Sequence, residues 1–216
     1  QNYNTSGLDY SYGPEKKENR LLTLYANYNK LVESIKSSFD VTAGYDYQYW
    51  KSTTPLYSEM NTLGEIQKTS KAKDERHVLL SYYGRLNYSL DSRYMLTTTV
   101  RRDATSRFAK NVRWGTFPSV ALGWRVTEES FLKENKVLSN LKIRASYGVT
   151  GQQDGIGNYN YLPIYTGSQN GAEASMGNGY IHTYRPSSYV PDLKWETTTS
   201  WNVGFDFGFL KDRITG

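Results

Sequence analysis

Residues 195–209 alternate between two kinds of side chain over about fifteen positions. The odd positions are Trp195, Thr197, Thr199, Trp201, Val203, Phe205, Phe207 and Phe209, and the even positions are Glu196, Thr198, Ser200, Asn202, Gly204, Asp206 and Gly208. Because successive side chains of a strand point to opposite sides, this pattern predicts a β-strand with one apolar and one polar face. Soluble strands most often have about 5–6 residues, whereas a strand tilted across a bilayer needs about 9–11. The segment therefore predicts a membrane-crossing strand of a β-barrel.

Six further stretches show the same two-residue period: 21–30, 39–50, 76–90, 94–102, 113–126 and 141–150. The connections between them are mostly short at one end of the predicted sheet. At the other end lie the long segments 51–75 and 151–193, which we interpret as outer loops. Transmembrane barrels have this asymmetry between short turns and long loops. We therefore predict an all-β chain of about seven strands in an antiparallel up-and-down meander.

The composition agrees with a barrel wall and excludes several other classes. The chain has 20 Tyr and 5 Trp, which suit aromatic girdles at the membrane interfaces, and Tyr88 and Tyr94 flank a tight turn at 91–93. Zero Cys and two His exclude disulfide frameworks, zinc fingers and thiolate metal sites. No cofactor is expected. The net charge of +5 is spread along the chain, which argues against a nucleic-acid partner.

Strand parity identifies side chains that would face the interior of a barrel. This set consists of Asp40, Asp46, Gln48, Arg85, Asn87, Arg101, Arg125, Lys142, Arg144, Glu196, Asn202 and Asp206. As candidates for the interior wall or the ligand path we select Trp50, Asp46, Gln48, Arg85, Arg101, Asp103, Arg107, Arg125, Arg144 and Glu196. The sequence does not divide them between ligand contact and structural contact.

Three tryptophans and one charged cluster allow two interpretations each. Trp50, Trp114 and Trp195 have rings that suit stacking on sugars or a membrane girdle. The girdle is favoured for the last two, whereas parity places Trp50 on the polar side. The cluster at 101–103 and 107–108 suits either an outer mouth for an anionic or hydroxyl-rich ligand or an ion-pair network at a strand end, and the network is favoured.

Several motifs, in order along the chain, resemble the SusC/RagA family of TonB-dependent outer-membrane transporters. They lie at residues 83–89 (YGRLNYS), 93–108 (RYMLTTTVRRDATSRF), 114–124 (WGTFPSVALGW), 141–151 (LKIRASYGVTG) and 192–197 (DLKWET). Ala104 and Val190 stand where the family tends to have Gly and Asn. The resemblance is specific because separated motifs agree from about residue 82 onward.

The resemblance implies a bacterial outer-membrane protein that is not an enzyme. It implies a 22-stranded barrel closed by an N-terminal plug, in contact with outer-membrane lipid. Such a protein imports oligosaccharides or peptides with a SusD-like surface lipoprotein and energy from TonB. Residues 1–216 would form part of this barrel, without the plug or the C-terminal strands.

Two other function classes remain open from the residues alone. One is a soluble or cell-surface all-β carbohydrate-binding module, in which the apolar face would pack under a second sheet. The other is a β-rich glycoside hydrolase whose carboxylates would include Asp103 or Glu196. The direction in which the apolar face points separates the barrel from the module.

Overall fold

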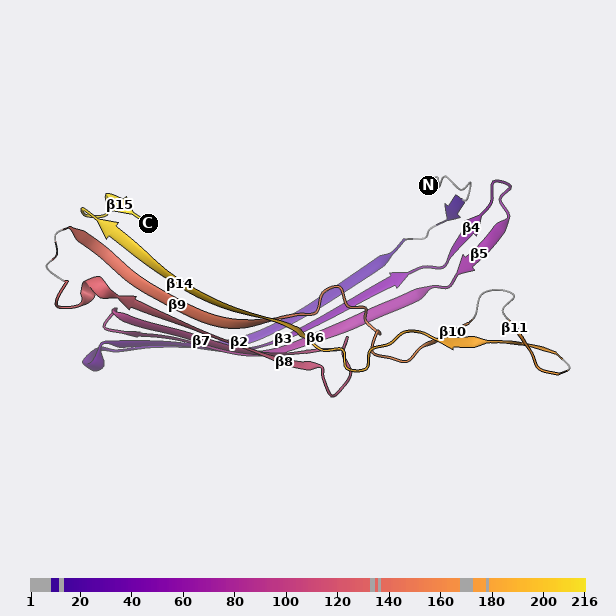
Figure 1. Cartoon of the computed structure of the whole chain (residues 1–216), viewed down its shortest axis with the longest axis horizontal. Coiled ribbons are helices and arrows are strands. Elements are labelled where there is room, and N and C mark those ends of the chain that lie inside the picture. Colours follow the sequence, from indigo (N-terminus) through magenta and orange to yellow (C-terminus); the bar gives the residue numbers. More distant parts are fainter. Residues whose placement is uncertain (1–8, 12–13, 133–134, 136, 168–172, 178) are drawn as a thin grey trace.

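A computed structural model describes residues 9–11, 14–132, 135, 137–167, 173–177 and 179–216. Its main feature is one curved eight-stranded antiparallel sheet in the order β15-β14-β9-β8-β7-β6-β3-β2 (Figure 1). The strands are β2 (Lys16–Val32), β3 (Ser37–Thr54), β6 (Lys73–Leu90), β7 (Tyr94–Thr105), β8 (Trp114–Arg125), β9 (Leu138–Gln152), β14 (Glu196–Phe209) and β15 (Ile214–Thr215). Each long strand pairs with the next long strand along the chain, so the predicted up-and-down meander is confirmed.

The predicted outer loops contain more strand than the sequence indicated. Residues 51–54 and 73–75 continue β3 and β6, and the segment between them holds β4 (Tyr57–Met60) and β5 (Ile66–Ser70). β4 pairs with β5 on one side and with β1 (Asp9–Ser11) on the other, which makes a small three-stranded sheet. The second loop carries two ribbons, β10 (Tyr165–Gly167) with β13 (Tyr184–Pro186) and β11 (Glu173–Ser175) with β12 (Tyr180–His182). Residues 168–172 and 178 of this loop lie outside the described residues.

Short connections close the opposite end of the sheet, which we call the short-turn end. They are η1 (Glu33–Ile35), the turns at 91–93 and 210–213, and a longer connection that begins with η2 (Val126–Glu128). In the turn between β6 and β7, Asp91 and Ser92 both have positive φ, at 52° and 53°. Two consecutive positive φ values are the geometry of the tight hairpin turn that matches strand twist. Within the described residues, no helix is long and apolar enough to cross a membrane.

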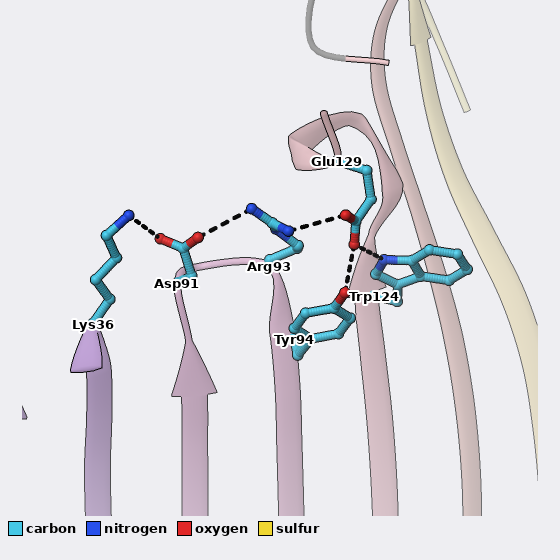
Figure 2. A network of polar contacts seen from close by, with 6 residues as sticks. All are labelled: Lys36, Asp91, Arg93, Tyr94, Trp124 and Glu129. Atoms are coloured by element: carbon cyan, nitrogen blue, oxygen red, sulfur yellow. Dashed lines mark hydrogen bonds and ion pairs between the residues drawn. The ribbon is translucent and has the colours of Figure 1, made fainter. Parts of the chain in front are cut away.

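An ion-pair network joins three of these turns (Figure 2). The Arg93 guanidinium lies between two carboxylates, with Nη2 3.1 Å from Asp91 Oδ2 and Nη1 2.9 Å from Glu129 Oε2. Lys36 Nζ contacts the other Asp91 oxygen at 3.2 Å. The second Glu129 oxygen accepts hydrogen bonds from the Tyr94 hydroxyl at 2.6 Å and from Trp124 Nε1 at 3.0 Å. Tyr94, which the sequence placed near this end, and Trp124 are thus held by their polar atoms.

A small aromatic core forms at the other end, which we call the long-loop end. Phe108 is fully buried and packs edge-on against Trp195, which in turn packs edge-on against Phe117. The core lies where β8 and β9 separate, because their pairing stops at Ser119 and Gly148. Pro118 occupies the next position of β8, so its missing N–H removes no bond to β9.

Trp195 therefore corrects one expectation from the sequence. It was favoured as a membrane-girdle residue, but its side chain is buried in this core and its Nε1 donates to the carbonyl of Arg113 at 2.9 Å. Trp195 lies just before β14, whose first residue is Glu196, so the alternation of faces along the strand does not apply to it. A Cβ on Gly151 would lie 2.1 Å from the Phe117 ring, so the core also depends on a glycine at that position.

Candidate functional site

The apolar face of the sheet is uncovered within the described residues. Trp201, Val203 and Phe205 of β14 are 75%, 71% and 65% exposed. A soluble module would bury this face under a second layer, because burial of apolar area is what stabilises such a fold. The exposure counts against the carbohydrate-binding module.

Aromatic residues mark two levels on this face. Trp114 and Trp124 lie ten residues apart on β8, near its opposite ends. At about 3.4 Å per residue they are separated by about 34 Å along the strand, and a tilt of about 40° projects this to about 26 Å. The apolar band of a transmembrane barrel is about 25 Å tall, with aromatic girdles at both edges. The face therefore matches the thickness of a membrane.

Strand register places the predicted polar set together on the opposite face. Asp46 pairs with Ser81 and Ser81 with Asp103, while Arg101 pairs with Phe117, and residues paired across an antiparallel sheet share a face. Continuing the same pairings places on this face Asp40, Gln48, Trp50, Arg85, Asn87, Arg125, Lys142, Arg144, Glu196, Asn202 and Asp206. Arg107 follows β7 in a loop.

Arg101 is the centre of the densest polar contacts on this face. Its Nε donates to both oxygens of Asp103, at 2.9 and 3.1 Å, and its Nη2 donates to the hydroxyl of Ser81 at 2.8 Å. Its Nη1 lies 3.5 Å from Asp46, and its guanidinium stands over the Tyr83 ring. Asp103 and Ser81 are buried. This geometry is the ion-pair network that the sequence favoured for this segment.

The rest of the charged cluster is dispersed. Arg102 lies on the apolar face, where its guanidinium stands 5.0 Å from the centre of the Trp114 ring. Phe108 belongs to the aromatic core. Arg107 bridges to the long loop, with Nε donating to Asn158 Oδ1 at 3.1 Å and Nη1 to the Gln153 carbonyl at 3.2 Å. The cluster is therefore not one binding site.

The remaining predicted residues are spread over the polar face. Arg144 Nη2 donates to Asp206 at 2.6 Å, and Arg85 Nε donates weakly to Asn87 at 3.4 Å. Gln48, Arg125 and Glu196 follow the same face by register, far apart along the sheet. They do not converge on one centre. Among the described residues there is also no cluster of three or more His, Cys, Asp or Glu side chains suited to a metal ion.

Trp50 is the predicted residue with the most specific surroundings. Its ring stacks on His77 of β6 at a centroid distance of 4.4 Å and an interplanar angle of 18°. His77 and Asn158 were not among the predicted site residues. The pairing of Trp50 with His77 requires the register of a hairpin whose connection is long, and Asn158 lies in a loop without a repeating pattern. No local sequence signal identifies either contact.

These observations define the class of the molecule. One sheet layer carries an uncovered apolar band of membrane thickness on one side and a continuous polar surface on the other, which is a section of the wall of a transmembrane β-barrel. A family profile described as TonB dependent receptor-like, beta-barrel matches residues 1–216. The chain belongs to this family, whose members SusC and RagA are outer-membrane β-barrel proteins.

Relatives from two organisms support the same family. The chain is 45% identical over 205 residues to TonB-dependent receptor SusC of Bacteroides thetaiotaomicron, covering 88% of this chain and 20% of the relative. It is 33% identical over 210 residues to TonB-dependent receptor P39 of Formosa agariphila, covering 88% and 19%. The chain thus spans about a fifth of the length of these relatives.

A solved structure shows the same fold. The structure of the RagAB peptide transporter superposes with a TM-score of 0.77 over 93% of this chain and 23% of the other chain. At 23% sequence identity, this likeness concerns the fold alone. The family profile and the SusC relative confirm the resemblance to the SusC/RagA family, and the fold of this structure agrees with it.

Proposed function

We propose that residues 1–216 form part of the barrel wall and outer loops of an outer-membrane receptor that imports an oligosaccharide or a peptide. The plug and the remaining strands belong to other parts of the receptor. Energy comes from TonB, and a SusD-like surface lipoprotein takes part in ligand capture. The match to receptors about five times as long as this chain supports the assignment.

The two faces of the sheet then have separate roles. The apolar face contacts lipid, and the polar face lines the interior of the barrel. The single observation that carries this proposal is the uncovered apolar face, with Trp201, Val203 and Phe205 exposed on one layer of sheet. The short-turn end faces the periplasm and the long-loop end faces the cell exterior, as in other barrels.

The receptor is not proposed to catalyse a reaction. A glycosidase needs two carboxylates that can approach a substrate. Both oxygens of Asp103 accept hydrogen bonds from Arg101, and the side chain is buried. Asp103 therefore serves to hold Arg101 in place, and the ligand crosses the membrane unchanged.

Deletion of the full-length gene in its native host tests the function. Growth should be lost on one class of glycan or peptide as the sole carbon source, and deletion of TonB should give the same defect. The intact gene supplied in trans should restore growth. Unchanged growth on every glycan and peptide substrate used by the parent strain would contradict import.

The outer ribbons allow a finer test of capture. Tyr165 and Pro186 pair directly, so residues 166–185 can be replaced by a short Gly-Ser turn without separating the flanking chain. The aromatic core and the contacts of Arg107 lie outside this deletion. We expect normal assembly in the outer membrane, shown by heat-modifiable mobility on gels, with weaker ligand capture. Unaltered uptake would show that the ribbons have no part in capture.

A further inference from the structure

A pocket of about 350 Å³ opens on the polar face at the long-loop end. We call it the rim pocket. Its lining consists of Lys17, Glu18, Asn19, Trp50, Lys51, Ser52, Glu75, His77, Arg107 and Asn158. By register, three neighbouring strands supply its floor, while Arg107 and Asn158 come from the loops after β7 and β9. Its volume lies at the low end of the range for ligand sites, which suits one short segment of a larger ligand.

The stack of Trp50 and His77 gives the pocket an oriented aromatic surface. The two rings are close to parallel, and this stacking restricts the orientation of each ring. On its other side Trp50 has Asn19, its register partner on β2, whose short side chain is too small to cover an indole face. Arg107 Nη2 lies 3.5 Å from His77 Nε2 and supports the stack from the loop side. Trp50 is partly exposed, and we infer that its face away from His77 is the one open to a ligand.

Hydrogen-bonding groups surround this ring. Asn158 accepts a hydrogen bond from Arg107 Nε through Oδ1, which leaves both N–H groups of its amide directed elsewhere. Asn19 adds a second amide, and Ser52 a hydroxyl that donates to Glu15 at 2.8 Å and retains its acceptor capacity. Amide and hydroxyl groups both donate and accept, which matches the alternating needs of sugar hydroxyls.

The charges of the pocket are balanced locally. The two lining cations that share the face of Trp50 or reach the pocket from the loop each have an acidic neighbour: Lys17 lies 3.5 Å from Glu15, and Arg107 lies 3.9 Å from Asp154. By register, Glu18 and Lys51 point to the opposite face of the sheet. Glu75, the acid of the lining on the face of Trp50, is also paired, with Lys73. A charged ligand would have to compete with these pairs, whereas an uncharged ligand would not.

We propose that the rim pocket binds a neutral pyranose unit of the imported ligand. The C–H face of the sugar packs on Trp50, and its hydroxyls bond to Asn19 and Asn158. The inference rests on the proposed function, and it narrows the ligand from oligosaccharide or peptide to an uncharged glycan. A peptide would bring charged termini or side chains to a pocket whose own charges are already paired.

Binding to the purified full-length receptor in detergent tests this inference. The probes are malto-, cello- and mannohexaose as neutral glycans, hexagalacturonate as an acidic glycan and a mixture of decapeptides, measured by isothermal titration calorimetry. We expect at least one neutral hexasaccharide to bind. Trp50→Ala should weaken it by about tenfold or more, the scale for loss of one aromatic anchor, and Trp50→Phe should recover part of the loss. The matched control Trp114→Ala removes a tryptophan from the apolar face and should leave the affinity for the glycan unchanged.

The outcomes separate this inference from the proposed function. Two results would contradict sugar binding in the rim pocket: no neutral probe binds, or a neutral glycan binds equally well to Trp50→Ala. Neither result contradicts import by the receptor. Peptide or galacturonate binding that depends on Trp50 overturns the neutral-sugar assignment. If Trp50→Ala fails to assemble, Asn158→Ala gives the same decision from the loop side. If deletion of the gene causes no growth defect on any glycan or peptide, the proposed function itself is contradicted.

Discussion

The two ends of the sheet are stabilised by different means. At the short-turn end, residues of neighbouring turns meet through charges, as in the contacts of Arg93 with Asp91 and Glu129 (Figure 2). At the long-loop end, Phe108 from the loop after β7, Phe117 of β8 and Trp195 just before β14 meet through buried rings. Compact turns leave no room for a core and must be fixed by polar contacts. Long loops supply a core of their own and can form pockets.

The largest expected effect is on the aromatic core. Phe108→Ala removes a fully buried ring, a change that costs about 3–5 kcal/mol in well-packed cores. We expect faster hydrogen exchange in the loops at 105–113 and 153–162, with no change at the turn of residues 91–93. Phe131→Ala is the control, because that ring is exposed and lies on the short-turn side. Equal loosening of both ends would show that they are one cooperative unit.

The sequence predicted the strands better than it predicted the ends. Period-two alternation is a local property of each strand, so it located seven strands and both faces, including the polar positions Asp46 and Arg101. The burial of Trp195 depends on where β8 and β9 separate, and the stack of Trp50 on His77 depends on hairpin register. Both are contacts between distant residues that no local pattern contains.

Charge placed in the apolar band gives the next largest effect. Val120 lies between Trp114 and Trp124 on β8. Val120→Arg should destabilise the barrel by about 2–4 kcal/mol, the cost of a cation near the bilayer midplane. The measurement is urea unfolding of the full receptor in lipid vesicles. Ser119→Arg, on the adjacent residue and the opposite face, should have little effect, and equal destabilisation by both changes would contradict the assignment of faces.

Acid should weaken the short-turn end selectively. Hydrogen bonds from Tyr94 and Trp124, together with the charge of Arg93, lower the pKa of Glu129 below its usual value of 4.5. A lowered folded-state pKa gives stabilisation that is present above about pH 4.5 and is lost as the pH falls through the folded value. The melting temperature of the receptor in detergent should therefore decrease as the pH is lowered below about 4.5.

A neutral amide separates this effect from general acid unfolding. Glu129→Gln keeps the acceptor oxygen for Tyr94 and Trp124 but cannot titrate. The variant should melt lower than the parent at pH 7 and should show a smaller further loss between pH 5 and pH 3.5. A parallel pH profile for parent and variant would show that Glu129 does not link the turns.

The smallest expected effect concerns the girdle on the apolar face at the long-loop end. Arg102 stands over Trp114, and an exposed contact of this kind contributes about 0.5–1 kcal/mol. Arg102→Ala should lower stability by that amount in vesicles, and Arg102→Lys should retain part of it. A loss comparable to that of Phe108→Ala would mean that Arg102 also supports the core.

Solvent contact at two adjacent residues of β14 tests the account most directly. The chain contains no cysteine, so single spin labels at Asn202→Cys and Val203→Cys can be introduced in a cysteine-free full-length receptor in lipid vesicles. We predict that the label at 203 collides preferentially with oxygen dissolved in the bilayer, while the label at 202 collides with a water-soluble nickel complex. A label at 203 that meets the nickel complex as readily as the label at 202 would contradict the assignment of the apolar face to lipid.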